Sequence, residues 1–326
     1  MSGSDVGAWQ GSADKAEDHL KLTADQNQLI TARWEAAKEA RGRLDGIMQG
    51  IEHQSAERGG RLEGLEHSLK GLDSFRRKAA VTVKRNGGDA QEVCEEVDDL
   101  NRYTLTFEAD EYVQGTKQAY AELRERGFET VSEYNTWEDP VYKGVNTAWE
   151  HPETKEKFEL QFHTPESFKA KSDNHELYEL ARSGKFEEFN TKKDPKRSEA
   201  YQEASDLLQN ERYENVRIPP GVEELNERKI RATLNPELDP EVIEHVRRME
   251  ADLKATHATE AAAKAQQHQP ANSLANGLGE SLDTGGPGLR DRLGTRAEQP
   301  QLRTEARPAV ADPVPTQSRG RGRSMS

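Results

Sequence analysis

The stretch DLNRYTLTF (99–107) decides the fold class of this chain. Its segment RYTLTF alternates apolar and polar residues, as a strand with one buried face does. Three further strand candidates follow, namely FETVSEYNTW (128–137), YKGVNTAWE (142–150) and KFELQFHT (157–164). The turn-rich HPETKE joins the last two. These segments predict a small antiparallel or mixed sheet.

Helical spacing surrounds these strands on both sides. Residues 110–126 have apolar side chains at helical intervals and end at Gly127, and residues 172–182 and 198–212 repeat that spacing. Helices packed against a small mixed or antiparallel sheet give an α+β fold class.

The N-terminal part, residues 13–72, is charged and contains few helix breakers. Its apolar residues recur at helical intervals: Leu44, Ile47, Met48, Ile51, Leu62, Leu65 and Leu69. Gly59-Gly60 is expected to interrupt the helices. The narrow stripe suits a helix that supports the following domain, which is the favoured reading, or a hairpin or partner helix.

The C-terminal part lacks the residues of a core, because every aromatic lies at or before Tyr213. Asp239-Pro240 is typical of a helix start, and the helix is expected to continue to about Ala255. We therefore divide the chain into a helical arm (1–61), a folded domain (62–221), a helical extension (222–256) and a disordered tail (257–326).

The composition restricts the class of function. Only 33% of the residues are hydrophobic and the formal charge is −14, which predicts one modest core and makes nucleic acid an unlikely partner. Cys94 is the only cysteine, so one chain can form neither a disulfide nor a thiolate zinc site. No apolar run is long enough to span a membrane, and no standard export signal begins the sequence. A cytoplasmic location is expected, with a specialised export route left open.

Two acidic residues fall at strand edges, Asp99 before RYTLTF and Glu159 within FELQF. Carboxylates on two strands of one sheet can hold Mg²⁺ between substrate phosphates. With 60 acidic residues in the chain, a strand cap or solvent-facing carboxylate is the better reading on spacing alone.

A cluster of six cations follows the arm: Lys70, Arg76, Arg77, Lys78, Lys84 and Arg85. Such density could neutralise a triphosphate, or it could be a solvated helix face. The sequence has no GxxxxGK[ST] loop, no GxGxxG after a strand and no His-Asp dipeptide, so side chains would have to hold a nucleotide. His163 and His175 are acid/base candidates, although a lone histidine beside a strand is more often structural.

Five motifs in order resemble the synthetase domain of the RelA/SpoT nucleotide pyrophosphokinases, closest to the small single-domain and toxin-like members. They are LKGLDSFRRKA (69–79), DLNRYTLTF (99–107), YKGVNTAW (142–149), FELQFHTPESF (158–168) and HELYE (175–179), followed by VRIPPG (216–221). The resemblance covers about half of the chain and implies a nucleotidyltransferase-like fold. The chain departs from the pattern at Glu133, near which the family commonly has a lysine, and at His163, where the long synthetases have arginine.

The resemblance also implies a role for each matching residue. Lys70, Ser74, Arg77 and Lys78 would hold the phosphates of ATP, and Asp99 and Glu159 would bind Mg²⁺ and carry the catalysis. Tyr142 would stack on the acceptor base, and Gln161 and His163 would complete the site.

The implied reaction transfers pyrophosphate from ATP to the 3′-hydroxyl of a purine nucleotide, and a growth-arresting toxin or effector could use it. The expected protein partners are an antitoxin or immunity protein, or a second copy of this chain that associates through the N-terminal arm. The alternative is a catalytically inactive fold that serves as a binding or assembly module.

Overall fold

The structure is a computed structural model that describes residues 7–12, 17–85, 87–225, 228–230, 232–235 and 237–267. This part contains α-helices and two β-sheets, which confirms the α+β class. Most of the predicted tail lies outside the described residues, although helix α8 (Pro240–Gln267) continues beyond the predicted end near Ala255. None of the described helices is long and apolar enough to cross a membrane.

The larger sheet has five strands in the order β3-β4-β7-β6-β5. Their bounds are β3 (Arg61–Glu63), β4 (Arg102–Thr106), β5 (Glu129–Asn135), β6 (Val145–Glu150) and β7 (Lys157–His163). Strands β4 and β7 are parallel and the other neighbours are antiparallel, so the sheet is mixed. The four strands predicted by sequence, β4 to β7, are all present.

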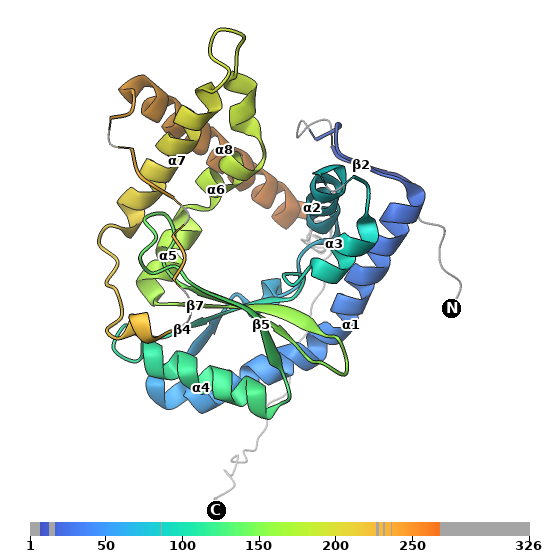
Figure 1. The fold of residues 1–326 in the computed structure, drawn as a ribbon, viewed down its shortest axis with the longest axis vertical. Coiled ribbons are helices and arrows are strands. Elements are labelled where there is room, and N and C mark those ends of the chain that lie inside the picture. Colours follow the sequence, from blue (N-terminus) through green and yellow to red (C-terminus); the bar gives the residue numbers. More distant parts are fainter. Residues whose placement is uncertain are drawn as a thin grey trace, which may run out of the picture. The chain divides into compact units, whose positions relative to one another are not determined.

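The remaining elements surround this sheet. The helices are α1 (Ala24–Ser55), α2 (Leu72–Arg85), α3 (Ala90–Glu96), α4 (Tyr112–Glu125), α5 (Pro165–Asp173), α6 (His175–Arg182), α7 (Arg197–Tyr213) and α8, and the short strands β1 (Trp9–Gln10) and β2 (Lys21–Leu22) form the second sheet. In Figure 1, α4 and part of α1 lie against one face of the larger sheet. Helices α2 and α3 lie on one side of its other face, and α5 to α8 lie on the opposite side.

The two faces of the sheet differ because side chains alternate along each strand. The face toward α1 and α4 is apolar, and its buried members on the two parallel strands are Tyr103, Leu105, Phe158, Leu160 and Phe162. The alternate positions on the opposite face are polar: Arg102, Thr104, Thr106, Glu159, Gln161 and His163. The sequence alternation therefore gives the sheet a core face and a polar face.

Helix α1 is a support helix of the core. Its C-terminal half buries Leu44, Met48 and Ile51 in the cluster under the sheet. Its N-terminal half buries Ile30 and Ala37 in a second cluster, which contains α2, α3 and β2. Because this chain covers the apolar stripe itself, the stripe is not free for self-association.

The prediction of long helices up to residue 72 is wrong at its C-terminal end. The helical stretch ends by Arg58, and Gly59 follows with a φ of 73°. Leu62 lies in the edge strand β3, and Leu65 lies in a 3₁₀ turn (Leu65–His67). Spacing alone cannot separate a short amphipathic strand from a continued helix, because both place one apolar side chain in the core.

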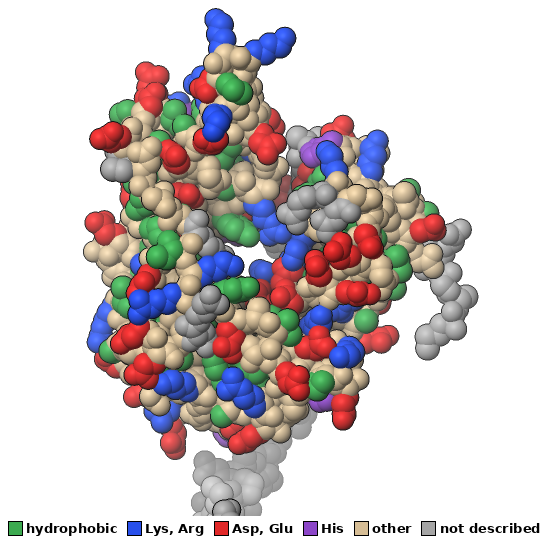
Figure 2. Space-filling view, viewed as in Figure 1, with side chains coloured by type: hydrophobic (Ala, Val, Ile, Leu, Met, Phe, Trp, Pro, Cys, Tyr) green, Lys and Arg blue, Asp and Glu red, His purple; other side chains and the backbone are tan. Residues whose placement is uncertain are grey.

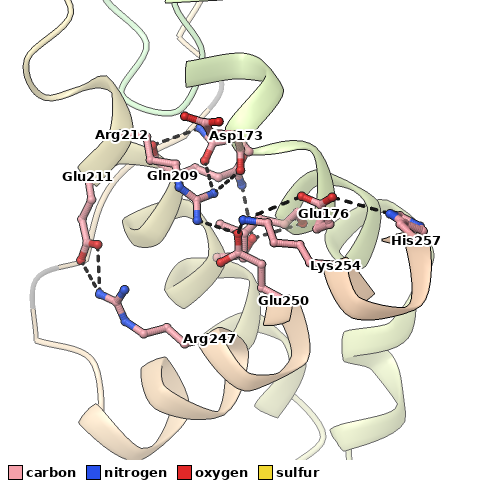
Figure 3. Close-up of polar contacts among 12 residues, drawn as sticks. Asp173, Glu176, Gln209, Glu211, Arg212, Arg247, Glu250, Lys254 and His257 are labelled. Carbon is pink, nitrogen blue, oxygen red and sulfur yellow. Dashed lines mark hydrogen bonds and ion pairs between the residues drawn. The ribbon is translucent and has the colours of Figure 1, made fainter. Parts of the chain in front are cut away.

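A third hydrophobic cluster joins α6, α7 and α8 around Leu177, Leu208 and Val246. Figure 3 shows the polar contacts at its border. Arg212 of α7 donates 2.5 and 2.7 Å hydrogen bonds to Glu250 of α8 and to the carbonyl oxygen of Asp173. These bonds connect α8 with the C-terminal end of α5.

Candidate active site

Backbone hydrogen bonds bring the start of α2 to the start of β4 and β7. The amide of Lys70 donates to the carbonyl oxygen of Leu100 at 2.8 Å, and the amide of Glu159 donates to that of Asn101 at 2.9 Å. In the parallel register, Arg102 lies opposite Glu159. Three segments that are distant in sequence therefore present charged side chains at one edge of the polar face.

Asp99 is held by three cations. Its Oδ2 accepts from Lys70 Nζ at 2.5 Å and from Arg102 Nη2 at 3.1 Å, and its Oδ1 accepts from Lys78 Nζ at 2.8 Å. Burial alone would raise the pKa of this carboxyl, but the two lysine charges and their hydrogen bonds lower it well below its ordinary value. Burial lowers the pKa of Lys70 to about 8, despite the opposing effect of Asp99. Asp99 is therefore an anion fixed in a cationic pocket.

Arg102 connects the two carboxylates predicted from sequence. The Nε of this arginine donates to Glu159 Oε2 while its Nη2 contacts Asp99. Burial lowers the pKa of the guanidinium, but the charges of Glu159 and Asp99 reverse that effect and leave it raised. Arg102 therefore places one positive charge between Asp99 and Glu159.

The network continues along β7 to α5. Gln161 Nε2 donates to Glu159 Oε1 at 2.9 Å, and Lys171 of α5 donates to Gln161 Oε1. The contacts thus form one chain from Lys70 and Lys78 to Lys171, with the carboxylates between.

Tyr142 and His163 form a second pair next to this network. The hydroxyl of Tyr142 donates to Asn146 Oδ1 at 2.8 Å and lies 3.0 Å from His163 Nε2. His163 is fully buried, and its Nδ1 lies 3.0 Å from both the carbonyl oxygen of Lys143 and the hydroxyl of Ser167. Burial and the nearby Lys171 charge lower the pKa of His163 well below its ordinary value. With both nitrogens engaged, this neutral histidine orients Tyr142.

Gly144 is required by the packing of His163. A Cβ at this position would lie 2.7 Å from Cε1 of the imidazole and 3.0 Å from the carbonyl oxygen of Phe162. The glycine in the YKG segment thus allows the histidine to approach the backbone of the segment that directly precedes β6.

Two predicted residues lie outside the network. Ser74 is exposed on α2, and Arg77 forms an ion pair with Glu17 at 3.4 Å. The two lysines of the predicted phosphate site, Lys70 and Lys78, therefore contact Asp99, whereas Arg77 contacts Glu17 of the N-terminal segment.

Figure 2 shows a hollow between the side that carries α2 and α3 and the side that carries α5 to α8, with Lys and Arg side chains around it. Two other surface hollows, of about 340 and 530 Å³, are lined by none of the network residues. The network itself lies on the polar face of the sheet, where Asp99 and Glu159 are mostly buried.

The carboxylates form a small donor set for a metal ion. Within the part of the chain that the structure describes, no group of three or more His, Cys, Asp or Glu side chains is arranged to hold a metal. A hard cation at Asp99 and Glu159 would therefore complete its oxygen shell with water and substrate oxygens, as Mg²⁺ does at phosphate sites.

No protein-family model matches the chain, and no curated protein matches it significantly. Solved structures of similar fold include the type VI effector Tas1 in complex with its immunity protein, with 19% identity and a TM-score of 0.36 over 57% of this chain and 94% of that one. Small alarmone synthetase 1 from Bacillus subtilis has 16% identity and a TM-score of 0.34 over 55% and 91% of the two chains. The protein smu.1046c from Streptococcus mutans UA159 has 14% identity and a TM-score of 0.35 over 55% and 92%. The similar structures thus include an alarmone synthetase, the class that the sequence motifs resemble, but at these values they support no functional inference.

Sequence reasoning missed three charged residues of the site: Asp98, Arg102 and Lys171. The alternation of RYTLTF places Arg102 on the polar face, which was a usable signal. Lys171 was missed because α5 was not predicted, although Thr164-Pro165 provides both its N-cap and a proline at its first turn. No sequence signal marks Asp98, where burial raises the carboxyl pKa and the charges of Asp99 and Glu159 add to that effect.

Proposed function

We propose that this chain is a Mg²⁺-dependent nucleotide pyrophosphokinase, which transfers pyrophosphate from ATP to the 3′-hydroxyl of a purine nucleotide. The observation that carries the proposal is the contact of Arg102 with both Asp99 and Glu159. One cation position within reach of two carboxylates, with lysines on either side, is what transfer between two polyanions requires.

The two carboxylates suit Mg²⁺ because this ion prefers oxygen ligands and because the positively charged Arg102 guanidinium already contacts both of them. Asp99 and Glu159 would hold the ion, which would neutralise charge on the phosphates of the donor. Because each carboxylate oxygen accepts from a protein donor in this structure, the bonds from Lys70, Lys78 and Arg102 must rearrange when the ion binds.

The side chains of this network would position the two substrates. Lys70 and Lys78, once released from Asp99, would contact the donor phosphates, and Arg77 and Ser74 of the same helix would extend that contact. Glu159 would orient the acceptor hydroxyl and receive its proton. Tyr142 would stack on the acceptor base, held in orientation by His163.

The transfer is balanced without any further reactant. A bond forms between the 3′-oxygen of the acceptor and the β-phosphorus of ATP, and the bond from that phosphorus to the α,β-bridging oxygen breaks. AMP leaves with the bridging oxygen, and the acceptor retains the pyrophosphate. Alignment and charge neutralisation would supply most of the rate.

A growth-arresting role follows from the same chemistry. An enzyme of this kind consumes ATP, and the sequence contains no His-Asp dipeptide of the phosphohydrolase type that could reverse the reaction. A cell that makes such a protein needs to neutralise it, so we include an antitoxin or immunity protein as a proposed partner.

The direct test is to incubate the purified chain with labelled ATP, Mg²⁺ and AMP, ADP, GDP or GTP in turn. We expect AMP release and a pyrophosphorylated product with at least one acceptor, and a loss of roughly 100-fold or more in Asp99→Asn and Glu159→Gln. Glu166→Gln, at an exposed position of α5, is the matched control and should retain activity. AMP release that persists in both site variants would exclude the assignment.

A second candidate function is an inactive fold that binds a nucleotide without reaction. It is favoured by the saturation of Asp99 and Glu159 by protein donors in this structure. Equilibrium dialysis with ATP distinguishes the two functions. The inactive fold would bind ATP equally with and without Mg²⁺ and release no AMP, whereas the enzyme would need the ion.

A further inference from the structure

Lys171 differs from the other cations of the site in having no counterion. Lys70, Lys78 and Arg102 each pair with Asp99 or Glu159. Lys171 Nζ donates to the neutral amide oxygen of Gln161 and lies 5.5 Å from the centre of the Phe168 ring. Among the residues that the structure describes, no carboxylate oxygen lies within 4.0 Å of it.

Burial of the Lys171 ammonium group without a counterion is energetically unfavourable. Lys171 is half-buried, and burial lowers its pKa to about 8. The positive charge of Arg102 acts in the same direction, and the negative charge of Glu159 opposes it. An ammonium group that is partly removed from water and lacks a counterion attracts an anionic ligand. The other members of the network cannot be that anion, because their carboxylates are already paired.

The place of Lys171 in the chain of contacts indicates which ligand it faces. Gln161 separates it from Glu159, so it lies at the opposite end of the network from Lys70 and Lys78. Its helix also supplies Ser167, which contacts His163, and His163 contacts the Tyr142 hydroxyl. Lys171 therefore belongs to the side of the site where Tyr142 would hold the acceptor base.

We infer that Lys171 binds a phosphate group of the acceptor, so that the site selects a nucleoside phosphate over the corresponding nucleoside. This inference rests on the proposed function, because it assigns a specificity residue to the acceptor of that reaction. Lys171 is a binding residue in this proposal. Gln161, which contacts both Lys171 and Glu159, keeps the lysine apart from that carboxylate.

The test compares Lys171→Met, which keeps the length of the side chain without its charge, with Lys171→Arg and with the control Lys169→Met. Lys169 lies on the same helix, is 75% exposed and pairs with Asp173. In Lys171→Met we expect kcat/KM to fall roughly 10- to 100-fold for ADP or GDP as acceptor, the loss of one charged hydrogen bond. The values for adenosine or guanosine, and the KM for ATP, should stay within about twofold of wild type. Lys171→Arg should recover part of the loss, and Lys169→Met should behave as wild type.

A binding measurement separates failure of this inference from failure of the proposed function. ADP and GDP are titrated by calorimetry into protein saturated with an ATP analogue that has a methylene group between the α- and β-phosphorus. Weaker binding in Lys171→Met than in Lys169→Met supports the acceptor role even if no turnover is found. Equal affinities, or an equal loss of activity with nucleotide and nucleoside acceptors, would overturn it.

Discussion

Arg102 shares its two carboxylates with any metal ion that binds between them. Without the Arg102 side chain, Asp99 would keep its hydrogen bonds from Lys70 and Lys78. Glu159, which is 17% exposed, would keep only the hydrogen bond from the Gln161 amide. A poorly solvated carboxylate that loses its cation destabilises the folded state.

We therefore expect Arg102→Leu to lower the free energy of unfolding by about 1–3 kcal/mol in the absence of metal, less than for a fully buried pair because Arg102 is 40% exposed. Added Mg²⁺ should restore more stability in the variant than in wild type, because the ion replaces the missing cation. Urea unfolding with and without Mg²⁺ measures both effects. An equal gain in the two proteins would show that Mg²⁺ does not occupy the position of Arg102.

His163 makes the stability of the fold depend on pH. Burial and the Lys171 charge place its folded-state pKa well below the ordinary value of 6.5, so the unfolded chain binds a proton more readily. The stabilisation from the neutral imidazole is present above pH 6.5 and is lost as the pH falls below it.

The free energy of unfolding should therefore fall more between pH 7.5 and about 5.5 in wild type than in His163→Gln, which has no proton to gain. Urea unfolding at the two pH values provides the comparison. His67→Gln, at an 85% exposed position, should keep the pH dependence of wild type. The role assigned to His163 is wrong if its substitution leaves the pH dependence unchanged.

Helix α1 aligns the site through two hydrogen bonds to the segments around Asp99. The indole Nε1 of Trp34 donates to the carbonyl oxygen of Lys70 at 2.7 Å, and the carbonyl oxygen of Ala37 accepts from Asn101 Nδ2 at 2.9 Å. One turn of this helix thus holds the Lys70 carbonyl, just before α2, and the Asn101 side chain, two residues after Asp99.

Trp34→Phe keeps an aromatic ring at this position but removes the donor to Lys70. We expect a loss of about 0.5–2 kcal/mol in the free energy of unfolding, because a partly buried carbonyl oxygen loses its partner. The affinity for ATP should also fall, because Lys70 is held less firmly. Trp9→Phe is the control, because the Trp9 indole donates no hydrogen bond to a described residue. Urea unfolding and ATP titration of both variants check this role, and equal behaviour of the two would contradict it.

The elements differ in how well the sequence predicts them. The strands β4, β6 and β7 follow from period-two alternation, since one face of each carries large apolar side chains of the core and the other carries mostly polar side chains. The predicted strand bounds also put Asp99 and Glu159 each at the edge of a strand. The contacts of Arg102 and Lys171 could not be predicted, because they depend on the parallel register of β4 with β7 and on the packing of α5. Arg77 shows the same limit, because its partner Glu17 lies sixty residues away along the chain.

At the scale of the whole described chain, the site lies where two hydrophobic clusters meet. Helix α2 belongs to the cluster with Phe75, whereas β4, β7 and α5 belong to the cluster with Phe162 and Ala170. A ligand that contacts the cations of α2 and the polar side chains of β7 therefore connects both clusters. The third cluster, around Val246, supplies no residue of the charged network.

Ligand binding should therefore stabilise the protein in a way that depends on the network and not on the third cluster. With the methylene ATP analogue and Mg²⁺ at about 100 times Kd, we expect a gain of about 2.7 kcal/mol, which corresponds to a rise in Tm of roughly 5–10 °C. Asp99→Asn should lose most of this rise, because a neutral amide is a poor ligand for Mg²⁺. Val246→Ala should lower the Tm of the free protein and leave the rise nearly unchanged, because this buried side chain lies in the α6–α8 cluster. Thermal unfolding of the three proteins with and without the ligand measures these shifts. A rise in Asp99→Asn that equals the rise in wild type would mean that the nucleotide binds elsewhere on the chain.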